Sequence, residues 1–386
     1  MTSAERVGVV GTGLIGTSIA MAAIRAGDAV RGFDVSAEVL ERAAARSGLA
    51  PARSLEECVR GATLVFVCTP IPSLAELAVR ALAAAPEAVV SDVGSVKGTV
   101  TAEVVRRADP ADLGRFVGGH PMGGSERSGP DRASASVLDG VVWVLSPTPG
   151  TDPSALERLE AWTRRIGASP VRMEAERHDR LVAVVSHLPQ VASTALMGLA
   201  AAEEAGEPQM LLLAAGGFRD LTRLAASSPR LWADILLANR EEVAGALERY
   251  AARLLELREL ILQGRGVEVE EAFAHAKAAR LALAAKPQVK AGVAVLQVPI
   301  PDRPGVLGEL TAALGAAEVN IEDLQIVHSP EGGRGTVHLT VAASAAEDAE
   351  RVLRERWFEP LAGSLAARGL PALLLPVPEG EDAKTL

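Results

Sequence analysis

Seven short apolar runs occupy residues 6 to 172, and they restrict the fold of this part of the chain more than any other feature. They are RVGVV, AVRGFD, TLVFVC, AVVSDV, RFVGG, VVWVLS and PVRM. Such runs are typical of buried strands, and the segments between several of them are alanine-rich with the period of amphipathic helices. An alternation of strand and helix predicts a parallel, doubly wound α/β sheet of the Rossmann type.

Two further zones follow this first one. From residue 173 to about 286 the strand signals stop and long segments show helical period, which predicts an all-α domain. AAKPQVKAG is typical of a linker. Beyond it a strand-helix-strand-strand-helix pattern with a final strand, PALLLPVP, predicts a ferredoxin-like α+β plait. A chain of 386 residues is long enough for two or three domains. The expected divisions are 1–172, 173–287 and 288–378, with a tail at 379–386.

Composition excludes several classes of function. The net charge is −10, and lysine and arginine form no cluster, so we expect no nucleic-acid partner. No uninterrupted apolar run approaches membrane-spanning length, and the N-terminus does not resemble a signal peptide; we therefore expect a cytoplasmic protein with no membrane partner. Cys58 and Cys68 lack metal-ligand spacing, so we expect no metal site.

A glycine motif, G-x-G-x-x-G, lies directly after the first strand and opens a helix. Gly11 permits a tight turn, Gly13 lets a pyrophosphate approach the backbone, and Gly16 lets the helix pack on the strand. Asp34 ends the second strand, at the distance expected of a ribose acceptor, and its charge disfavours a 2′-phosphate. The sequence therefore predicts NAD rather than NADP as cofactor. The expected cofactor-binding residues are Gly11, Thr12, Gly13, Leu14, Ile15, Gly16, Asp34, Thr69 and Pro70.

His120 lies in GGHPMGGSERSGP, just after the fifth strand and at the same edge of the sheet. A neutral histidine can accept the proton of a substrate hydroxyl as hydride leaves carbon. Ser95, in the neighbouring loop, can hydrogen-bond the imidazole or the substrate. An incidental turn histidine is the alternative interpretation of His120. His178, near a helix start, is expected to be structural.

Arg223 is the candidate for substrate anchoring in the helical zone. It lies in GGFRDLTRLAASSPRLW, and a guanidinium there is suited to bidentate capture of a carboxylate. Arg219, in the same segment, is expected to be a solvated charge on a helix face. The segment HDRLVAVVSHLPQ adds His187 to the set of polar candidates.

In these motifs the chain resembles the prephenate dehydrogenases of tyrosine biosynthesis, the TyrA family. GTGLIGTSIA, SDVGSVKG, GGHPMGGSERSG, VVSHLPQ and GGFRDLTRLA...LW match that family's signatures in order, over roughly residues 6 to 290. The resemblance implies NAD-dependent oxidative decarboxylation of a cyclohexadienol. The product would be 4-hydroxyphenylpyruvate from prephenate or, as the alternative, L-tyrosine from arogenate.

The resemblance also implies roles for individual residues. His120 would be the hydrogen-bond partner and base for the ring hydroxyl, with Ser95 supporting it, and Arg223 would bind the ring carboxylate. The remaining substrate-binding residues implied are His187, Glu126, Asp220 and Trp232. Glu126 and Asp220 would tune the polar network of the pocket. Trp232 would approach the neighbouring subunit's site, which implies a homodimer through the helical domain.

The C-terminal plait resembles ACT domains, which bind amino acids in biosynthetic enzymes. IPDRPGVLGELTAALGAAEVNIEDLQ matches their loop and first helix. The resemblance implies that this domain binds an effector, with L-tyrosine as the candidate, and the alternative is a domain that only aids assembly. The residues implied are Pro304, Gly305, Val306, Leu307, Asn320 and Ile321.

Three rival interpretations remain. β-Hydroxyacid dehydrogenases rely on a lysine early in the helical domain, whereas residues 173–276 contain no lysine. A non-catalytic NAD-sensing regulator would not need His120, Ser95 and Arg223 together. Within the resembling family, Glu126 could pair with the ammonium of arogenate, so the choice between prephenate and arogenate stays open.

Overall fold

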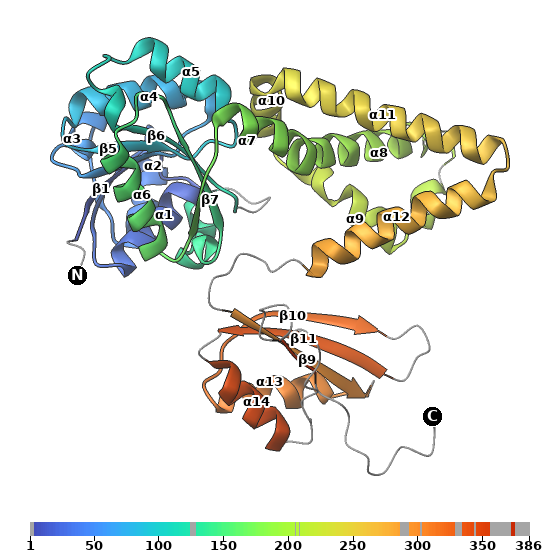
Figure 1. The fold of residues 1–386 in the computed structure, drawn as a ribbon. Coiled ribbons are helices and arrows are strands. Elements are labelled where there is room, and N and C mark those ends of the chain that lie inside the picture. The colour runs from blue at the N-terminus through green and yellow to red at the C-terminus, as the bar shows by residue number, and fades with distance from the viewer. Residues whose placement is uncertain are drawn as a thin grey trace. The chain divides into compact units, whose positions relative to one another are not determined.

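The computed structural model describes residues 4–123, 129–204, 206–207, 209–285, 293–301, 303–328, 334–342, 345–355 and 372–374. Its contacts divide the chain into two compact units, Met1–Leu283 and Ala284–Leu386. The first unit holds a large sheet and a set of long helices, and the second holds a small sheet with two helices (Figure 1). Glu126 and the expected tail at 379–386 lie outside the described residues.

The large sheet has eight strands in the order β3-β2-β1-β4-β5-β6-β7-β8. Seven of them coincide with the expected runs, and the two-residue strand β3 was not expected. The bounds are β1 Arg6–Val10, β2 Ala29–Phe33, β3 Ala50–Pro51, β4 Leu64–Val67, β5 Val89–Asp92, β6 Phe116–Pro121, β7 Val142–Pro147 and β8 Ser169–Arg172. The change of order next to β1 is the topological feature that marks ligand sites in sheets of this kind.

The expectation of a parallel sheet fails at one pair, because β7 runs antiparallel to β6. The described part of the connection between them contains only two short 3₁₀ turns, Pro130–Arg132 and Ala135–Leu138. A parallel pairing needs a crossover connection, usually a helix, to bring the chain back to the starting edge. Without that helix the chain turns back at the edge where β6 ends, and β8 then pairs in parallel with β7.

Helices cover both faces of this sheet (Figure 1). One face carries α1 (Leu14–Arg25), α2 (Ala37–Ser47) and α6 (Pro153–Arg165), and the other carries α3 (Leu55–Val59), α4 (Ile71–Ala84) and α5 (Gly98–Arg107). Neighbouring strand residues alternate between the two hydrophobic cores: Val9 belongs to the first core and Val10 to the second. Side chains in a strand alternate sides, so a run that is apolar throughout is buried on both faces.

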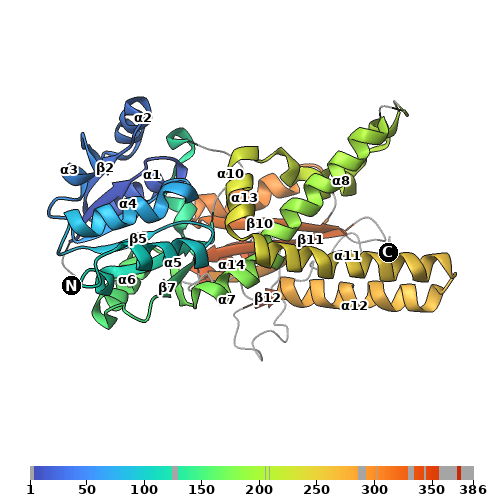
Figure 2. The same ribbon diagram turned by 90° about the horizontal axis from the view of Figure 1, so that it is seen from above.

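Two residues, Met173 and Glu174, separate β8 from the helical part of the first unit. Helix α7 (Ala175–Val182), a π-helical segment η4 (Ala183–His187) and α8 (Leu188–Glu204) form one continuous run. The helices that follow are α9 (Gly216–Thr222), α10 (Pro229–Ala238), α11 (Arg240–Leu262) and α12 (Gly266–Ala285). Helices α11 and α12 extend away from the large sheet, as Figure 2 shows from above.

The run Ala175–Glu204 is long and apolar enough, by length and composition, to cross a membrane. The sequence did not predict this, because Ser186, His187 and Gln190 interrupt the apolar pattern of the uncharged stretch 181–202. Core helices of soluble proteins, which are mostly buried, meet the same criterion; in this run 28% of the apolar window is buried, and His178, His187 and Gln190 are buried residues of the run.

The second unit has the strand order β10-β11-β9-β12, with α13 and α14 on one face (Figure 1). Its elements are β9 Val293–Pro301, α13 Val306–Ala316, β10 Ile321–His328, β11 Arg334–Ala342, α14 Ala346–Glu355 and β12 Ala372–Leu374. Leu296, Leu310, Leu339 and Leu353 form its buried centre. The succession of strands and helices is the one that the plait prediction expected, and β12 pairs with β9 in parallel.

Candidate active site

The glycine turn after β1 has a different physical requirement at each glycine. Gly11 has φ +91°, and a Cβ there would lie 2.5 Å from the carbonyl oxygen of Cys68. A Cβ on Gly16 would overlap the carbonyl oxygen of Gly11. A Cβ on Gly13, at the N-terminus of α1, would meet nothing within 4 Å. The chain's own packing therefore requires the first and third glycines, whereas the second borders open space beside a helix N-terminus, which fits a pyrophosphate.

Asp34, just after β2, is held by backbone donors. Its Oδ2 accepts from the Thr12 N–H at 2.8 Å, and its Oδ1 accepts from the Ser36 N–H at 3.0 Å. A carboxylate has about four lone-pair sites, so acceptor capacity remains for ribose hydroxyls. Thr69 and Pro70 precede α4, and Ser73 donates to the Thr69 hydroxyl at 3.1 Å. These residues fit a nicotinamide dinucleotide at the switch in strand order.

A buried ion pair that the sequence analysis did not identify lies at the end of β5. Lys97 and Asp92 are both fully buried, and the Lys97 ammonium donates to the Asp92 carboxylate. Asp92 also accepts from the N–H groups of Gly94, at 2.9 Å, and Gly119, at 3.2 Å. Burial lowers the pKa of Lys97, and the charge of Asp92 opposes that change. The pair joins the loop that carries Ser95 to the strand that carries His120.

His120, in β6, forms its contact with His178 and not with the expected partner, Ser95. The His120 Nδ1 and His178 Nε2 atoms are 2.8 Å apart, and the His178 Nδ1 lies 2.7 Å from Oδ1 of Asp179. Ser95 is half-buried in the loop between β5 and α5. His178, which was expected to be structural, is buried and lies in direct contact with the candidate base.

The surroundings of His120 favour the neutral imidazole. Desolvation lowers its pKa well below 6.5, and His178, Lys97 and His187 act in the same direction. Part of the residue remains exposed to solvent. A neutral and accessible histidine is suited to accepting a proton.

His187 and Trp232 lie on the helical side of this cluster. Their rings meet edge to face, with centroids 6.0 Å apart. The His187 Nδ1 is 3.2 Å from the amide nitrogen of Asn239, which also donates to the backbone carbonyl of Asp179 at 2.9 Å. Burial lowers the pKa of His187 to about 4, although Asp179 opposes this effect. Asn239, a second residue that the sequence analysis missed, thus joins His187 to the helix that carries His178.

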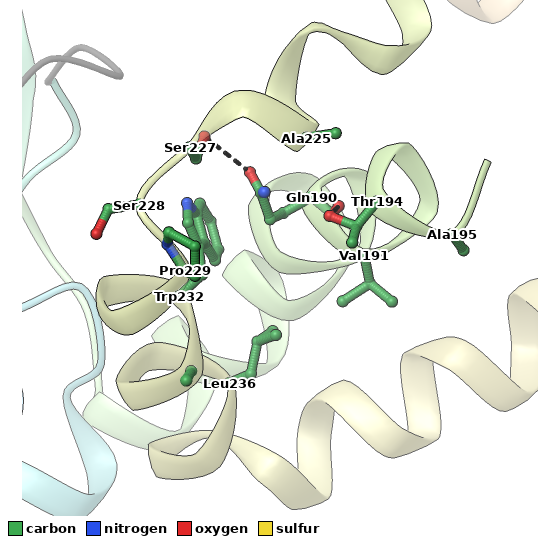
Figure 3. A pocket seen from close by; sticks show the side chains of 11 residues that line it. Gln190, Val191, Thr194, Ala195, Ala225, Ser227, Ser228, Pro229, Trp232 and Leu236 are labelled. Carbon is green, nitrogen blue, oxygen red and sulfur yellow. Dashed lines mark hydrogen bonds between the residues drawn. The ribbon is translucent and has the colours of Figure 1, made fainter. Parts of the chain in front are cut away.

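Trp232 also lines a pocket of about 450 Å³ between α8 and α10. Figure 3 shows Gln190, Val191 and Thr194 on the α8 side, and Trp232 and Leu236 on the α10 side. Gln190 accepts from Ser227 at 3.4 Å and donates to the Leu224 carbonyl at 2.8 Å. The pocket lining does not include Arg223, which begins the short segment η6 (Arg223–Ala226).

The other candidates of the helical domain lie at its surface. Arg219 and Asp220 are exposed on α9, and Arg223 is exposed just after it. Of the expected site residues, the described contacts join Thr12 to Asp34 and His187 to Trp232, and His120 contacts His178, which was expected to be structural.

Of the expected effector residues, Pro304, Gly305, Val306 and Leu307 lie at the start of α13, whereas Asn320 and Ile321 follow its C-terminal end, where β10 begins. Gly305 has φ +92° and borders open space, and Pro304 and Asn320 are exposed. Val306 is buried, and Leu307 and Ile321 pack against the same core. The backbone N–H groups of α13 are therefore the part of this segment that suits a carboxylate.

Comparison with known proteins identifies all three zones of the chain. Residues 19–171 match the family model "Prephenate dehydrogenase, nucleotide-binding domain", residues 174–275 match "Prephenate dehydrogenase, dimerization domain", and residues 294–356 match "ACT domain". The prephenate dehydrogenase of Bacillus subtilis is 34% identical over 342 residues, which cover 86% of this chain and 90% of that protein.

Solved structures agree with this assignment. The Aquifex aeolicus prephenate dehydrogenase, solved with hydroxyphenyl propionate and NAD+, is 30% identical with a TM-score of 0.68, over 73% of this chain and 99% of that one. The arogenate dehydrogenase of Synechocystis is 30% identical with a TM-score of 0.63, over 71% and 98%. The glycine turn after β1 fits a dinucleotide, and His120 is hydrogen-bonded to His178. Together with these matches, this shows that the chain belongs to the prephenate dehydrogenase family of oxidoreductases.

Proposed function

We propose that the protein catalyses the NAD-dependent oxidative decarboxylation of prephenate to 4-hydroxyphenylpyruvate, in the cytoplasm, as a step of tyrosine biosynthesis. The observation that carries the proposal is His120. It is neutral, partly exposed and supported by His178, at the carboxyl edge of a sheet whose glycine turn fits a dinucleotide. The A. aeolicus relative solved with NAD+ supports the choice of cofactor.

The reaction needs a hydride acceptor, a base and a carboxylate anchor. NAD, when bound, supplies the acceptor for the hydride that leaves the ring carbon carrying the hydroxyl. His120 accepts the proton of that hydroxyl as the carbonyl forms. The bond to the ring carboxylate then breaks, CO2 leaves, its electron pair enters the ring, and the former carbonyl oxygen takes back the proton from His120 to become the phenol hydroxyl. Because the ring becomes aromatic the step is strongly downhill, so the residues mainly position the reacting groups.

Substrate binding is assigned to the helical domain. Arg223 binds the ring carboxylate through a bidentate contact, and His187 and Trp232 line the approach to the ring. Ser95 supports His120 or the substrate hydroxyl, and Asp220 and Glu126 tune the polar network.

The assembly that we propose is a homodimer through the helical domain. The match to a dimerization model over residues 174–275 supports it. So do the apolar side chains that one chain leaves exposed along this domain, among them Val185, Leu212, Leu213, Leu237 and Leu255. Surfaces of this kind on a single chain mark interfaces between proteins.

Arogenate is the second candidate substrate, because a relative of similar identity and coverage is an arogenate dehydrogenase. Initial rates followed at 340 nm with both substrates, each with NAD and with NADP, test the proposal. We expect the highest kcat/KM for prephenate with NAD. A higher kcat/KM for arogenate would move the assignment to the second candidate. No rate with either substrate would overturn it.

A further inference from the structure

The carboxylate of Asp179, in the helical domain, contacts both the start of α5 and the ring of His178. Its Oδ1 accepts from the Lys97 N–H at 2.8 Å, and its Oδ2 accepts from the Gly98 N–H at 2.7 Å. These N–H groups open α5 of the nucleotide-binding sheet, and no side chain of that segment caps the helix. Unpaired N–H groups at a helix start favour an anion. Asp179 therefore acts as the cap of α5 from another part of the chain.

The same carboxylate determines which nitrogen of His178 carries the proton. An ionised carboxylate only accepts hydrogen bonds, so the His178 Nδ1, 2.7 Å from Oδ1, must donate. In neutral His178 the Nε2 atom then has only a lone pair. This lone pair faces the His120 Nδ1 at 2.8 Å, so the His120 Nδ1 must donate to it. The lone pair of neutral His120 is thereby left on Nε2.

We propose that His178 and Asp179 are positioning residues, which fix His120 in the Nδ1–H tautomer and leave its Nε2 as the proton acceptor. The arrangement makes the base dependent on the docking of the two domains. If α5 moves away from α7, the carboxylate loses the two N–H donors that fix its position, and it is no longer oriented to accept from His178. When His120 takes up the proton, the imidazolium donates to His178 while Asp179 stabilises the charge behind it.

This inference rests on the proposed function only for the role of His120 as base. The tautomer itself can be measured without substrate, on the full-length protein labelled with ¹⁵N-histidine, by two-bond ¹H–¹⁵N correlation spectra. Free neutral imidazole favours the Nε2–H form, so an Nδ1–H His120 would be diagnostic of the chain of contacts. An Nε2–H His120, or a doubly protonated His178, would overturn the proposal. A wrong substrate assignment would abolish activity and leave this spectrum unchanged.

Variants of His178 separate the hydrogen bond from ring packing. His178→Gln retains a carbonyl oxygen that can accept from the His120 Nδ1, whereas His178→Phe retains the ring shape and removes the acceptor. We expect His178→Phe to lower kcat at least tenfold, on the order seen for supporting residues, and to shift His120 toward the Nε2–H form. His178→Gln should keep the Nδ1–H form and more of the wild-type kcat. Equal losses of kcat with an unchanged tautomer in both would overturn the proposal.

Asp179→Asn tests the carboxylate, and Thr99→Val is its matched control. An amide cannot accept from all three N–H donors, so we expect both kcat and Tm to fall. Thr99 donates to the Ala238 carbonyl at 2.7 Å and so also joins α5 to the helical domain, but it does not contact Asp179 or the histidines. Thr99→Val should leave the tautomer of His120 and kcat near wild type. An Asp179→Asn enzyme with wild-type kcat and Tm would overturn the role assigned to the carboxylate. A Thr99→Val enzyme that loses as much kcat as Asp179→Asn would also overturn it, because the loss would then come from weaker docking of α5 on the helical domain.

Discussion

At the scale of single residues, the candidate site depends on how histidines are kept neutral. His120 is surrounded by protein atoms and by three groups that carry or can carry positive charge, His178, Lys97 and His187. Each of them makes a second positive charge unfavourable, so the imidazole stays available as an acceptor at neutral pH. Lys97 keeps its own charge paired with Asp92, within the loop that faces His120.

Replacing His120 tests its role as base. His120→Asn keeps a polar side chain but cannot take up the proton, so turnover should fall at least ~10²-fold, the lower end of general-base assistance. The KM for NAD should change little, because the variant leaves the glycine turn unaltered. Steady-state rates with prephenate and NAD provide both numbers. Near wild-type turnover would return His120 to the incidental-turn interpretation.

His187 connects protonation to stability. Its pKa is lowered from 6.5 to about 4 in the folded protein, so between these pH values the unfolded chain binds the proton more tightly. The effect of His187 on the free energy of unfolding is therefore fully favourable above pH 6.5 and is lost as pH falls toward about 4. Over this range the free energy of unfolding falls by roughly 3 kcal/mol. Urea unfolding at pH 7, 6 and 5 should show this loss in wild type and a smaller slope in His187→Gln. Equal slopes would contradict the assignment to His187.

Asp34 is expected to set the choice of cofactor. The N–H groups of Thr12 and Ser36 hold its carboxylate in place at the end of β2, where the ribose of a dinucleotide would lie. Asp34→Ser removes both a ribose acceptor and a repulsive charge, so the kcat/KM ratio of NAD to NADP should fall. Equal kcat/KM values for the two cofactors in wild type would show that Asp34 does not discriminate.

At the scale of elements, the turn between β1 and α1 separates glycines needed for folding from one needed for binding. Gly13→Ala adds a methyl group into open space, so stability should stay close to wild type while the KM for NAD rises. Gly16→Ala places the methyl group on the Gly11 carbonyl oxygen, and the resulting shift should cost about 1–3 kcal/mol of unfolding free energy. Denaturant unfolding and NAD titration of both variants distinguish these effects. The reverse pattern would mean that Gly13 has the packing role.

The connection after β6 shows how one missing helix changes a sheet. The strand pattern alone does not predict whether β7 runs parallel or antiparallel to β6. We expected a parallel arrangement because most other connections contain a helix. The antiparallel pairing sets Gly119 opposite Leu145 and His120 opposite Val144. The pairing of β6 with β5 involves Phe116 and Val117, so His120 lies beyond it and has its strand neighbour in β7.

At the scale of the whole molecule, the ACT domain is the candidate regulatory unit. If it binds L-tyrosine, the effector changes catalysis only by binding two arrangements of the proposed dimer unequally. A coupling of 1–3 kcal/mol would change substrate affinity about 5- to 150-fold. Tyrosine also resembles the product and can compete at the active site. Inhibition of the full chain therefore does not distinguish the two routes.

Two fragments distinguish them. We expect calorimetry to show L-tyrosine binding to residues 288–386, and residues 1–287 to lose much of the tyrosine sensitivity of the full chain. The fragments follow the division of the chain into two compact units near residue 284. A 288–386 fragment that binds no aromatic amino acid, together with a 1–287 fragment of undiminished sensitivity, would mean that the domain only aids assembly.

The sequence by itself determined the zones of the fold, the glycine turn and the position of Asp34. These features are local: strand and helix periods, a left-handed backbone at Gly11 and the spacing from the turn to the end of β2 are all set within a few tens of residues. His120 could be singled out because the sequence predicts it just after a strand whose place at the binding edge comes from the same alternation; the structure places it within that strand, β6. The expectation that the glycines before it form a loosely packed loop was wrong, because Gly118 and Gly119 are buried residues of β6.

Only the tertiary structure decided what supports His120. The pairing of His120 with His178 joins residues 58 positions apart, and the capping of α5 by Asp179 joins residues 81 positions apart. Whether Lys97 is a solvated lysine or a fully buried partner of Asp92 likewise depends on packing from several elements. Protonation states follow from burial and neighbouring charges, and these exist only when the elements have packed together.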